Sequence, residues 1–255
     1  MGSLRSLRYF ADGSFVYATN NDHKLRRVDA SGQVSVLVGA YPTGDGGPAP
    51  NAHLFLGTGA IALDNSGNLL VVDSSNYRVR RIATDGVITT VLGDGLNATG
   101  PESLLASRTS STPRAIAFSP TGELYVGEYA RIRKIKQNGT TVFVAGTGAY
   151  GYAGDGGPAT AAQFRYIQSL AFDRAGNLLV GDVGSYAIRK IDTSGFITTI
   201  AGDGTSGDPA DGGLARNARL GYFDSLAMHP SGNLYFLMGS KVRQIDTAGI
   251  LGTVP

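Results

Sequence analysis

The sequence contains no cysteine and no tryptophan, and only three of its 255 residues are histidine. Without cysteine the chain forms no disulfide and offers neither a thiolate nucleophile nor Cys ligands for zinc. Charged residues make up only 16% of the chain and the formal net charge is +2, whereas nucleic-acid binding needs enough basic side chains to neutralise several phosphates. No apolar run approaches the ~20 residues of a membrane span. We therefore expect neither a nucleic-acid partner nor a membrane-spanning helix.

Glycine, by contrast, is abundant and regularly spaced. The chain has 37 glycines, and two series of them run in step at intervals of 53 to 56 residues: Gly13, Gly67, Gly122, Gly176 and Gly232, and Gly32, Gly86, Gly139, Gly195 and Gly249. Self-similarity at a fixed period of this size is typical of repeat architectures, in which each unit buries its faces against its neighbours. The sequence thus predicts five copies of one supersecondary unit.

The fourth copy shows what one unit contains. Apolar runs occupy residues 169–172, 178–180, 188–191 and 196–201, with Gly176 and Gly195 in the turns that join them in pairs. These runs are short, rich in β-branched residues, and lack the 3.6-residue period of a helix. Four short strands joined by hairpins and repeated radially are the blades of a β-propeller. We therefore predict an all-β fold, a five-bladed β-propeller with four antiparallel strands per blade and no strand exchange at the seam.

The repeats divide the whole chain. They cover about residues 4–39, 58–93, 113–146, 167–202 and 223–255, and Gly-rich loops join them. Five units of this length leave no room for another domain. We expect residues 1–255 to form a single propeller domain.

Several of these segments resemble the NHL repeat family. Residues 67–73 (Gly-Asn-Leu-Leu-Val-Val-Asp) followed by 79–82 (Val-Arg-Arg-Ile) match the family's pattern, and residues 176–182 with 188–192 repeat it. The linker at 154–159 (Gly-Asp-Gly-Gly-Pro-Ala), seen again at 44–49 and altered at 211–215, is similar to the long-loop variety common in bacterial extracellular proteins. The resemblance implies an NHL-type propeller, favours an extracellular or periplasmic location, and allows the chain to be one part of a larger polypeptide. It implies no activity, because such propellers serve as RNA binders, sensors, adhesion modules and a few lyases.

An arginine stands at the centre of the third strand of every copy: Arg26, Arg80, Arg133, Arg189 and Arg243. A charge repeated once per blade serves more simply to hold each blade together than to supply five active sites. A buried guanidinium group must find acceptors to be tolerated. We predict a structural role for all five, with backbone carbonyls or acids of the same or the next blade as partners.

Positions that differ between copies are the candidates for binding. The residue at the start of each innermost strand reads Arg5, Gly59, Arg114, Gln168 and Asp224. We predict a ligand-binding site on the loop face, at the mouth of the channel, formed by Arg5, His23, Tyr77, Arg114, Tyr129, Gln168, Tyr186, Tyr222 and Asp224. Aromatic rings supply contact area there, while the few polar groups orient a ligand. The alternative is that the tyrosines only fill half-buried strand ends.

We predict no cofactor and no metal site. His23, His53 and His229 fall at different phases of the repeat, so they are too dispersed to share one metal. Two Gly-x-Gly-x-x-Gly sequences, at 146–151 and 202–207, follow a fourth strand with no helix after them, so we interpret them as blade connections and not as phosphate loops. Calcium held by Asp203, Asp208 and Asp211 stays an alternative, although their spacing is not that of a known calcium loop.

The leading hypothesis is a non-enzymatic binding or scaffolding propeller that recognises a peptide, glycan or protein. The alternative is a lyase or hydrolase in which Arg114, Asp224 and a tyrosine act as acid–base and anion-holding groups. A third interpretation, an engineered or evolutionary-model propeller without a ligand, suits the regularity of the repeat. The sequence leaves the ligand, the organism and the oligomeric state open.

Overall fold

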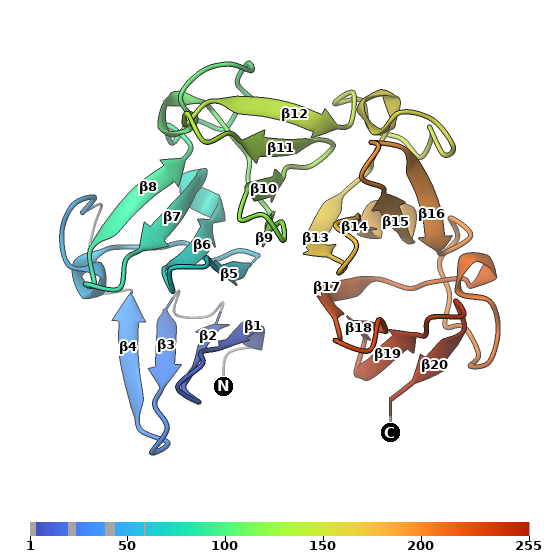
Figure 1. Cartoon of the computed structure of the whole chain (residues 1–255), viewed down its shortest axis with the longest axis horizontal. Coiled ribbons are helices and arrows are strands. Elements are labelled where there is room, and N and C mark those ends of the chain that lie inside the picture. Colours follow the sequence, from blue (N-terminus) through green and yellow to red (C-terminus); the bar gives the residue numbers. More distant parts are fainter. Residues whose placement is uncertain (1–3, 20–23, 39–43, 59, 255) are drawn as a thin grey trace. The chain divides into compact units, whose positions relative to one another are not determined.

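The computed structural model describes residues 4–19, 24–38, 44–58 and 60–254. Within these residues all regular structure is β-strand, apart from six short 3-10 turns. Twenty strands form five four-stranded sheets, and each sheet consists of four strands that are consecutive in the chain (Figure 1). The predicted five-bladed β-propeller of four-stranded antiparallel blades is therefore confirmed, and no described sheet takes a strand from the other end of the chain.

The strands of the first two blades are β1 (Leu4–Tyr9), β2 (Phe15–Thr19), β3 (Leu25–Val28) and β4 (Val34–Val38), then β5 (Ile61–Leu63), β6 (Leu69–Asp73), β7 (Arg78–Ile82) and β8 (Ile88–Leu92). The third blade comprises β9 (Ala115–Phe118), β10 (Leu124–Gly127), β11 (Ile132–Ile135) and β12 (Thr141–Ala145). The last two comprise β13 (Ile167–Phe172), β14 (Leu178–Asp182), β15 (Ala187–Ile191) and β16 (Ile197–Ala201), then β17 (Phe223–Met228), β18 (Leu234–Met238), β19 (Lys241–Ile245) and β20 (Leu251–Thr253). The 3-10 turns are η1 (Ala49–Asn51), η2 (Ser74–Asn76), η3 (Ala106–Arg108), η4 (Ala159–Ala161), η5 (Val183–Ser185) and η6 (Ala215–Asn217).

Two compact units make up the chain. Unit 1 consists of Met1–Ile116 and Ile135–Thr141, so it contains the first two blades and one hairpin turn of the third. Unit 2 consists of Ala117–Lys134 and Val142–Pro255, so it contains most of the third blade and the last two. The assignment of all 255 residues to one domain stays a prediction.

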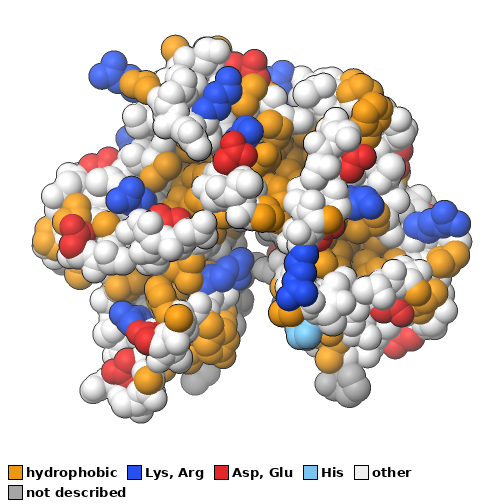
Figure 2. Space-filling model, viewed as in Figure 1, with side chains coloured by type: hydrophobic (Ala, Val, Ile, Leu, Met, Phe, Trp, Pro, Cys, Tyr) orange, Lys and Arg blue, Asp and Glu red, His pale blue; other side chains and the backbone are white. Residues whose placement is uncertain are grey.

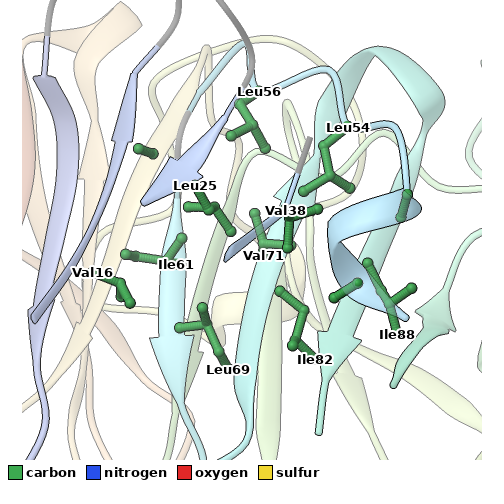
Figure 3. Close-up of a cluster of buried hydrophobic side chains, with 13 residues drawn as sticks. Val16, Leu25, Val38, Leu54, Leu56, Ile61, Leu69, Val71, Ile82 and Ile88 are labelled. Atoms are coloured by element: carbon green, nitrogen blue, oxygen red, sulfur yellow. The ribbon is translucent and has the colours of Figure 1, made fainter. Parts of the chain in front are cut away.

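Each unit has its own buried core. In unit 1 the cluster draws on the first blade, the second blade and the connection between them: Val16, Leu25 and Val38; Ile61, Leu69, Val71, Ile82 and Ile88; and Leu54 and Leu56 (Figure 3). In unit 2 a corresponding cluster lies around Phe223 and Phe236, whose rings meet edge to face at 5.6 Å. Strands β6 and β14 are buried at every position. Because both of their faces are covered, these strands appear in the sequence as continuous apolar runs.

The Gly-rich connections pair with the outer strands of the blades. We call residues 44–49, 101–106, 154–159 and 210–215 the edge linkers; each precedes its blade in the chain. In the fourth blade the N–H of Gly156 donates to Ile197 O (2.7 Å) and the N–H of Ile197 donates to Gly157 O (3.0 Å). The same two bonds recur at the outer-strand residues equivalent to Ile197, which are Ile88, Thr141 and Leu251. Each edge linker thus adds a short fifth strand to its blade.

The end of each edge linker also contacts the preceding blade. Ala159 O accepts the N–H of Gly146 at the end of the third blade, and Ala215 O accepts the N–H of Gly202 at the end of the fourth, both at 2.9 Å. Gly202 has a positive φ of 91°, and a Cβ there would collide with the carbonyl oxygen of Tyr186. One segment therefore holds two consecutive blades, and the close approach requires glycine.

Buried arginines anchor three of the edge linkers. Each guanidinium group is at most 3% exposed and pairs with the linker's aspartate, as Arg80 Nη2 to Asp45 (2.6 Å), Arg189 Nε to Asp155 (3.1 Å) and Arg243 Nη2 to Asp211 (2.8 Å). A buried cation without such a partner would carry a large desolvation cost. The aspartate of the Gly-Asp-Gly-Gly-Pro-Ala sequence is thus the counter-ion of the repeated arginine.

The fourth blade shows the arrangement most fully. Arg189 also donates to the carbonyl oxygens of Gln163 (2.9 Å) and Ala153 (3.1 Å). The second oxygen of Asp155 accepts the backbone N–H of Thr199 on the outer strand at 2.9 Å. Burial alone would raise the pKa of Asp155, but the hydrogen bonds from Thr199 and Arg189 outweigh it and hold the pKa below its usual value. One carboxylate therefore joins linker, arginine and outer strand.

The other two repeated arginines differ. Arg133 is fully buried, pairs with Glu128 at 3.2 Å and lies over the ring of Phe143 at 4.2 Å. Arg26 is half-buried in β3. The contacts of Arg80, Arg133, Arg189 and Arg243 are of the kind that a structural role requires, and the role itself stays a prediction.

Replacing Arg189 by alanine should lower the free energy of unfolding by about 3 kcal/mol, because Asp155 and two carbonyl groups lose their donors. Chemical denaturation of Arg189→Ala and wild type measures the difference. Arg174→Ala, in an exposed turn of the same blade, is the matched control and should change stability by less than about 0.5 kcal/mol. Equal losses in the two variants would show that Arg189 does not anchor the linker.

Gly202→Ala and Gly195→Ala form a second matched pair. Both residues have positive φ, 91° and 85°, and alanine costs about 1 kcal/mol in that conformation. A Cβ at position 195 meets nothing within 4 Å, whereas a Cβ at position 202 collides with the Tyr186 carbonyl. Gly202→Ala should therefore be the less stable variant, by a further ~1 to 3 kcal/mol of overpacking. Similar melting temperatures for the two variants would contradict the close approach.

Candidate functional site

Two of the predicted site residues contact each other in unit 2. Gln168 and Asp224 occupy the second position of β13 and of β17, the first strands of the fourth and fifth blades. Gln168 Nε2 donates to Asp224 Oδ1 at 3.1 Å, and both side chains are half-buried. A polar pair thus bridges two neighbouring blades.

Both strands are irregular at this point. The register of β13 shifts between Ile167 and Ser169, and that of β17 shifts between Asp224 and Leu226. Ser225 adopts a positive φ of 43° within the second irregularity. A β-bulge changes the direction of a side chain and occurs often beside functional sites. The sequence reasoning missed these bulges, because an extra residue in a short apolar strand leaves no distinct pattern.

Tyrosines flank the polar pair. Tyr129 and Tyr166 meet edge to face with ring centroids 5.4 Å apart, and Tyr129 O accepts the N–H of Ile167, the neighbour of Gln168, at 3.0 Å. Tyr222, two residues before Asp224, is 53% exposed, and Tyr129 is 37% exposed. We call Tyr129, Tyr166, Gln168, Tyr222 and Asp224 the Tyr-Gln-Asp surface. Its residues come from the third, fourth and fifth blades, and all of them belong to unit 2.

Tyr77 and Tyr186 occupy a different setting. Each follows a 3-10 turn, η2 or η5, in the left-handed conformation, with φ of 54° and 51°. Tyr186 packs against the core cluster of unit 2. This packing is what a tyrosine that fills a half-buried strand end would show. Their place in a binding site stays a prediction.

The remaining predicted site residues lie in unit 1. His23 and the side chain of Arg5 lie outside the described residues. Arg114 directly precedes β9 and is half-buried. Of the four residues predicted to share one opening, Arg5, Arg114, Gln168 and Asp224, the structure describes a contact between Gln168 and Asp224. The shared opening itself stays a prediction.

Buried carboxylates at the end of a blade's second strand bind the backbone that leads into the first strand of the same blade. Asp182 is fully buried and accepts the backbone N–H groups of Arg165 (3.1 Å) and Tyr166 (2.8 Å). Asp73, equally buried, accepts the N–H of Phe55 at 2.6 Å. Burial raises the pKa of both carboxyl groups above the usual value, although these hydrogen bonds oppose it. Asp182 thereby holds the backbone of Tyr166, one of the residues of the Tyr-Gln-Asp surface.

Each aspartate of the calcium alternative has a partner within the protein. Asp203 accepts the hydroxyl of Thr205 at 2.6 Å, Asp208 pairs with Lys241 at 3.0 Å, and Asp211 pairs with Arg243. Among the described residues, no three His, Cys, Asp or Glu side chains gather as a metal site would need.

The two described histidines each have a local contact. His53 stacks on Phe55 with ring centroids 5.0 Å apart. His229 Nδ1 lies 2.8 Å from the hydroxyl of Ser231. Both contacts belong to the loops that carry these histidines.

A pocket of about 470 Å³ lies in unit 2, away from the predicted site residues. It is formed by the connection before the fifth blade and the outer strand β20, and its lining includes Asp208, Pro209, Leu214, Arg219 and Leu251. The pocket could not be predicted from the sequence, because its lining comes from a Gly-rich connection whose shape depends on pairing with a distant strand.

The described surface mixes charges of both signs. In the view of Figure 2, Lys and Arg side chains lie scattered among Asp and Glu. No helix among the described residues has the length and apolar character needed to cross a membrane.

Comparison with known proteins gives relatives of two kinds. Teneurin-m of Drosophila melanogaster is 29% identical over 199 residues, which cover 71% of this chain and 7% of that protein. Among solved structures, virginiamycin B lyase from Staphylococcus aureus superposes with a TM-score of 0.60 at 16% identity, covering 99% of this chain and 69% of that one. A chain of a nidogen/laminin complex gives a TM-score of 0.65 at 17% identity, covering 99% and 80%.

These likenesses establish the fold and no more. The structural identities are too low to carry an activity from one protein to another, and this chain spans less than a tenth of the Teneurin it matches. No protein-family model matches the sequence. The chain is a β-propeller that is similar in fold to both an enzyme and a protein-binding module.

The raised pKa of Asp182 predicts a pH dependence of stability. The folded state holds this proton more tightly than the unfolded chain, in which an aspartate titrates near ~3.9, so stability is gained as pH falls through the folded pKa and lost as pH rises through it. Asp182→Asn keeps an acceptor oxygen but cannot titrate. The stability of wild type relative to Asp182→Asn should therefore increase as pH is lowered from 7 toward 4.5, measured by thermal melts in parallel. A difference that stays constant or shrinks over this interval would contradict a raised pKa.

Proposed function

We propose that this protein is a non-enzymatic binding propeller of the NHL type, which takes a peptide, glycan or protein partner on the Tyr-Gln-Asp surface. The observation that carries the proposal is the Gln168–Asp224 hydrogen bond between two blades, together with the exposed Tyr222 two residues before Asp224 and the exposed Tyr129, whose carbonyl accepts the N–H of Ile167. A repeat fold needs only small or apolar residues at the start of an inner strand. Polar residues held there at bulges, partly withdrawn from water, are better explained by a ligand.

The chemistry of the surface fits a ligand that has both donors and acceptors. Gln168 carries both donor and acceptor atoms and Asp224 carries a carboxylate, which are the side-chain types that bind a peptide amide or a sugar diol. Tyr129 and Tyr222 present flat, partly exposed rings, which supply contact area at a low entropy cost. The ligand class follows from this combination of rings and polar groups.

The relatives support binding as the class of function. Teneurin-m matches most of this chain in sequence, and the nidogen structure contains a protein partner, laminin. The lyase among the solved structures supports only the fold. The proposal includes that the chain is one part of a larger polypeptide, because the segment it matches is 7% of Teneurin-m.

Arrays of peptides and glycans, followed by calorimetry on any hit, test the proposal. Tyr222→Ala should weaken binding by about tenfold or more, because a partly exposed aromatic at the centre of a contact contributes strongly. Asp224→Ala should abolish binding, while the melting temperature stays near that of wild type. Tyr150→Ala is the matched control, because Tyr150 is 68% exposed and lies in the connection between the third and fourth blades.

Three outcomes would overturn the proposal. The first is the absence of any saturable ligand. The second is an equal loss of affinity in Tyr150→Ala and Tyr222→Ala, which would place the binding surface elsewhere. The third is wild-type turnover of the bound ligand that disappears in Asp224→Ala, which would assign the surface to a lyase or hydrolase.

A further inference from the structure

The outer strand of the first blade differs from the other four outer strands. Val34 of β4 pairs with Val28 of β3, as Ile197 pairs with Ile191 in the fourth blade, so Val34 is the counterpart of Ile197. The residues at this position in the other blades, Ile88, Thr141, Ile197 and Leu251, are at most 1% exposed. Val34 is 55% exposed, and Val36 is 43% exposed.

The edge linkers explain the difference. In the second to fifth blades a linker lies along the outer strand, through bridges at Pro48–Val87, Leu105–Thr140, Pro158–Phe196 and Leu214–Ile250. Among the described residues no such bridge reaches β4 or Gln33, the residue that corresponds to Phe196. In Figure 1, β4 forms one edge of the first sheet. Residues 33–36 therefore present an exposed strand edge with two valine side chains.

The hydrogen-bonding groups on this edge follow from the equivalent blades. In the fourth blade Ile197 uses its N–H and its carbonyl oxygen for the edge linker, and Thr199 donates its N–H to Asp155. By the same register, the outward groups of β4 are the N–H and carbonyl of Val34 and the N–H of Val36. These are the groups to which an added strand binds.

Arg26 stands at the position of the linker-binding arginines. It pairs in register with Tyr17 of β2, as Arg189 pairs with Val180 of β14 and Arg243 pairs with Phe236 of β18. In those two blades the arginine and the outer-strand N–H hold one carboxylate between them. An aspartate at the same position beside β4 would reach both Arg26 and the Val36 N–H.

We propose that the exposed edge of β4 binds an extended segment of the Gly-Asp-Gly-Gly-Pro-Ala type, supplied as a peptide ligand, in the way the edge linkers bind the other blades. Two backbone hydrogen bonds to Val34 set the register of the segment. Its aspartate accepts from the Val36 N–H and from Arg26. Its Pro-Ala end covers Val34, as Ala49 and Ala52 share one buried cluster with Ile88 in the second blade. The proposal is independent of the Tyr-Gln-Asp surface, which lies in the other unit.

The probe is a synthetic peptide with the sequence of residues 150–163, the natural edge linker of the fourth blade. Titrated into the intact protein, it should bind saturably and slow amide hydrogen exchange at Val34 and Val36. A peptide carrying Asp155→Ala should bind at least about tenfold more weakly, because it lacks the charged acceptor. This comparison changes only the peptide, so it does not depend on the folding of a protein variant.

Two protein variants complete the test. Val36→Pro removes the N–H that the aspartate requires and should abolish binding. Val36→Thr introduces the residue type found at the equivalent positions Thr199 and Thr253. It keeps the backbone N–H and should leave the affinity unchanged. The absence of saturable binding, equal affinity for the Asp155→Ala peptide, or slowed exchange at another strand would overturn the proposal. Exchange at Val34 that slows with protein concentration in the absence of peptide would also overturn it, because a second copy would then cover the edge.

Discussion

The pairing of the edge linkers with the outer strands is the interaction on which the rest of the structure depends. A four-stranded blade has an open edge, whose unpaired N–H and C=O groups need partners. The linker provides these partners, and its aspartate neutralises the arginine buried beneath it. Removing the linker would expose the strand edge and leave a buried cation alone. The outer strand, the arginine and the linker therefore form one cooperative element.

This element also explains how a polar site is tolerated on the inner strands. Because each edge linker contacts the blade before it as well as its own blade, neighbouring blades in a unit are held by backbone hydrogen bonds as well as by apolar packing. Asp182 then fixes the backbone of Tyr166 at the entry to β13. The bulges at Gln168 and Asp224 lie on a rigid support. A site supported in this way needs little ordering when a ligand binds.

The fold was predictable because its signals are local. Glycines such as Gly176 and Gly195 adopt the positive φ that tight turns require, so the hairpins appear directly in the sequence. The repeat period then gave five blades without strand exchange. The edge linkers were visible as a recurrent Gly-Asp-Gly-Gly-Pro-Ala sequence, but their pairing was not, because Gly-rich chain has no strand pattern and its partner strand is distant. For the same reason the sequence did not reveal the pocket beside Pro209.

The candidate site was harder to predict than the fold. Gln168 and Asp224 depart from the repeat in the sequence, but their mutual hydrogen bond could not be predicted because it depends on how two first strands pack. The left-handed backbone of Tyr186 and its packing on the core could not be predicted either, because both depend on the 3-10 turn before it. A repeat identifies which positions vary. Tertiary packing decides where their side chains lie.

The edge linkers also impose an order on folding during synthesis. Gly156 leaves the ribosome well before Ile197, the residue with which it pairs. The linker of each blade can pair only after the last strand of that blade has been synthesised. Until then its backbone N–H and C=O groups lack their partners in the outer strand. Such non-local pairing slows folding and lengthens the time in which strand edges are open to wrong partners. Glycine and proline in the unpaired linker disfavour β-aggregation. The segment that stays unpaired for a long time during synthesis is therefore one that has little tendency to pair with a wrong strand.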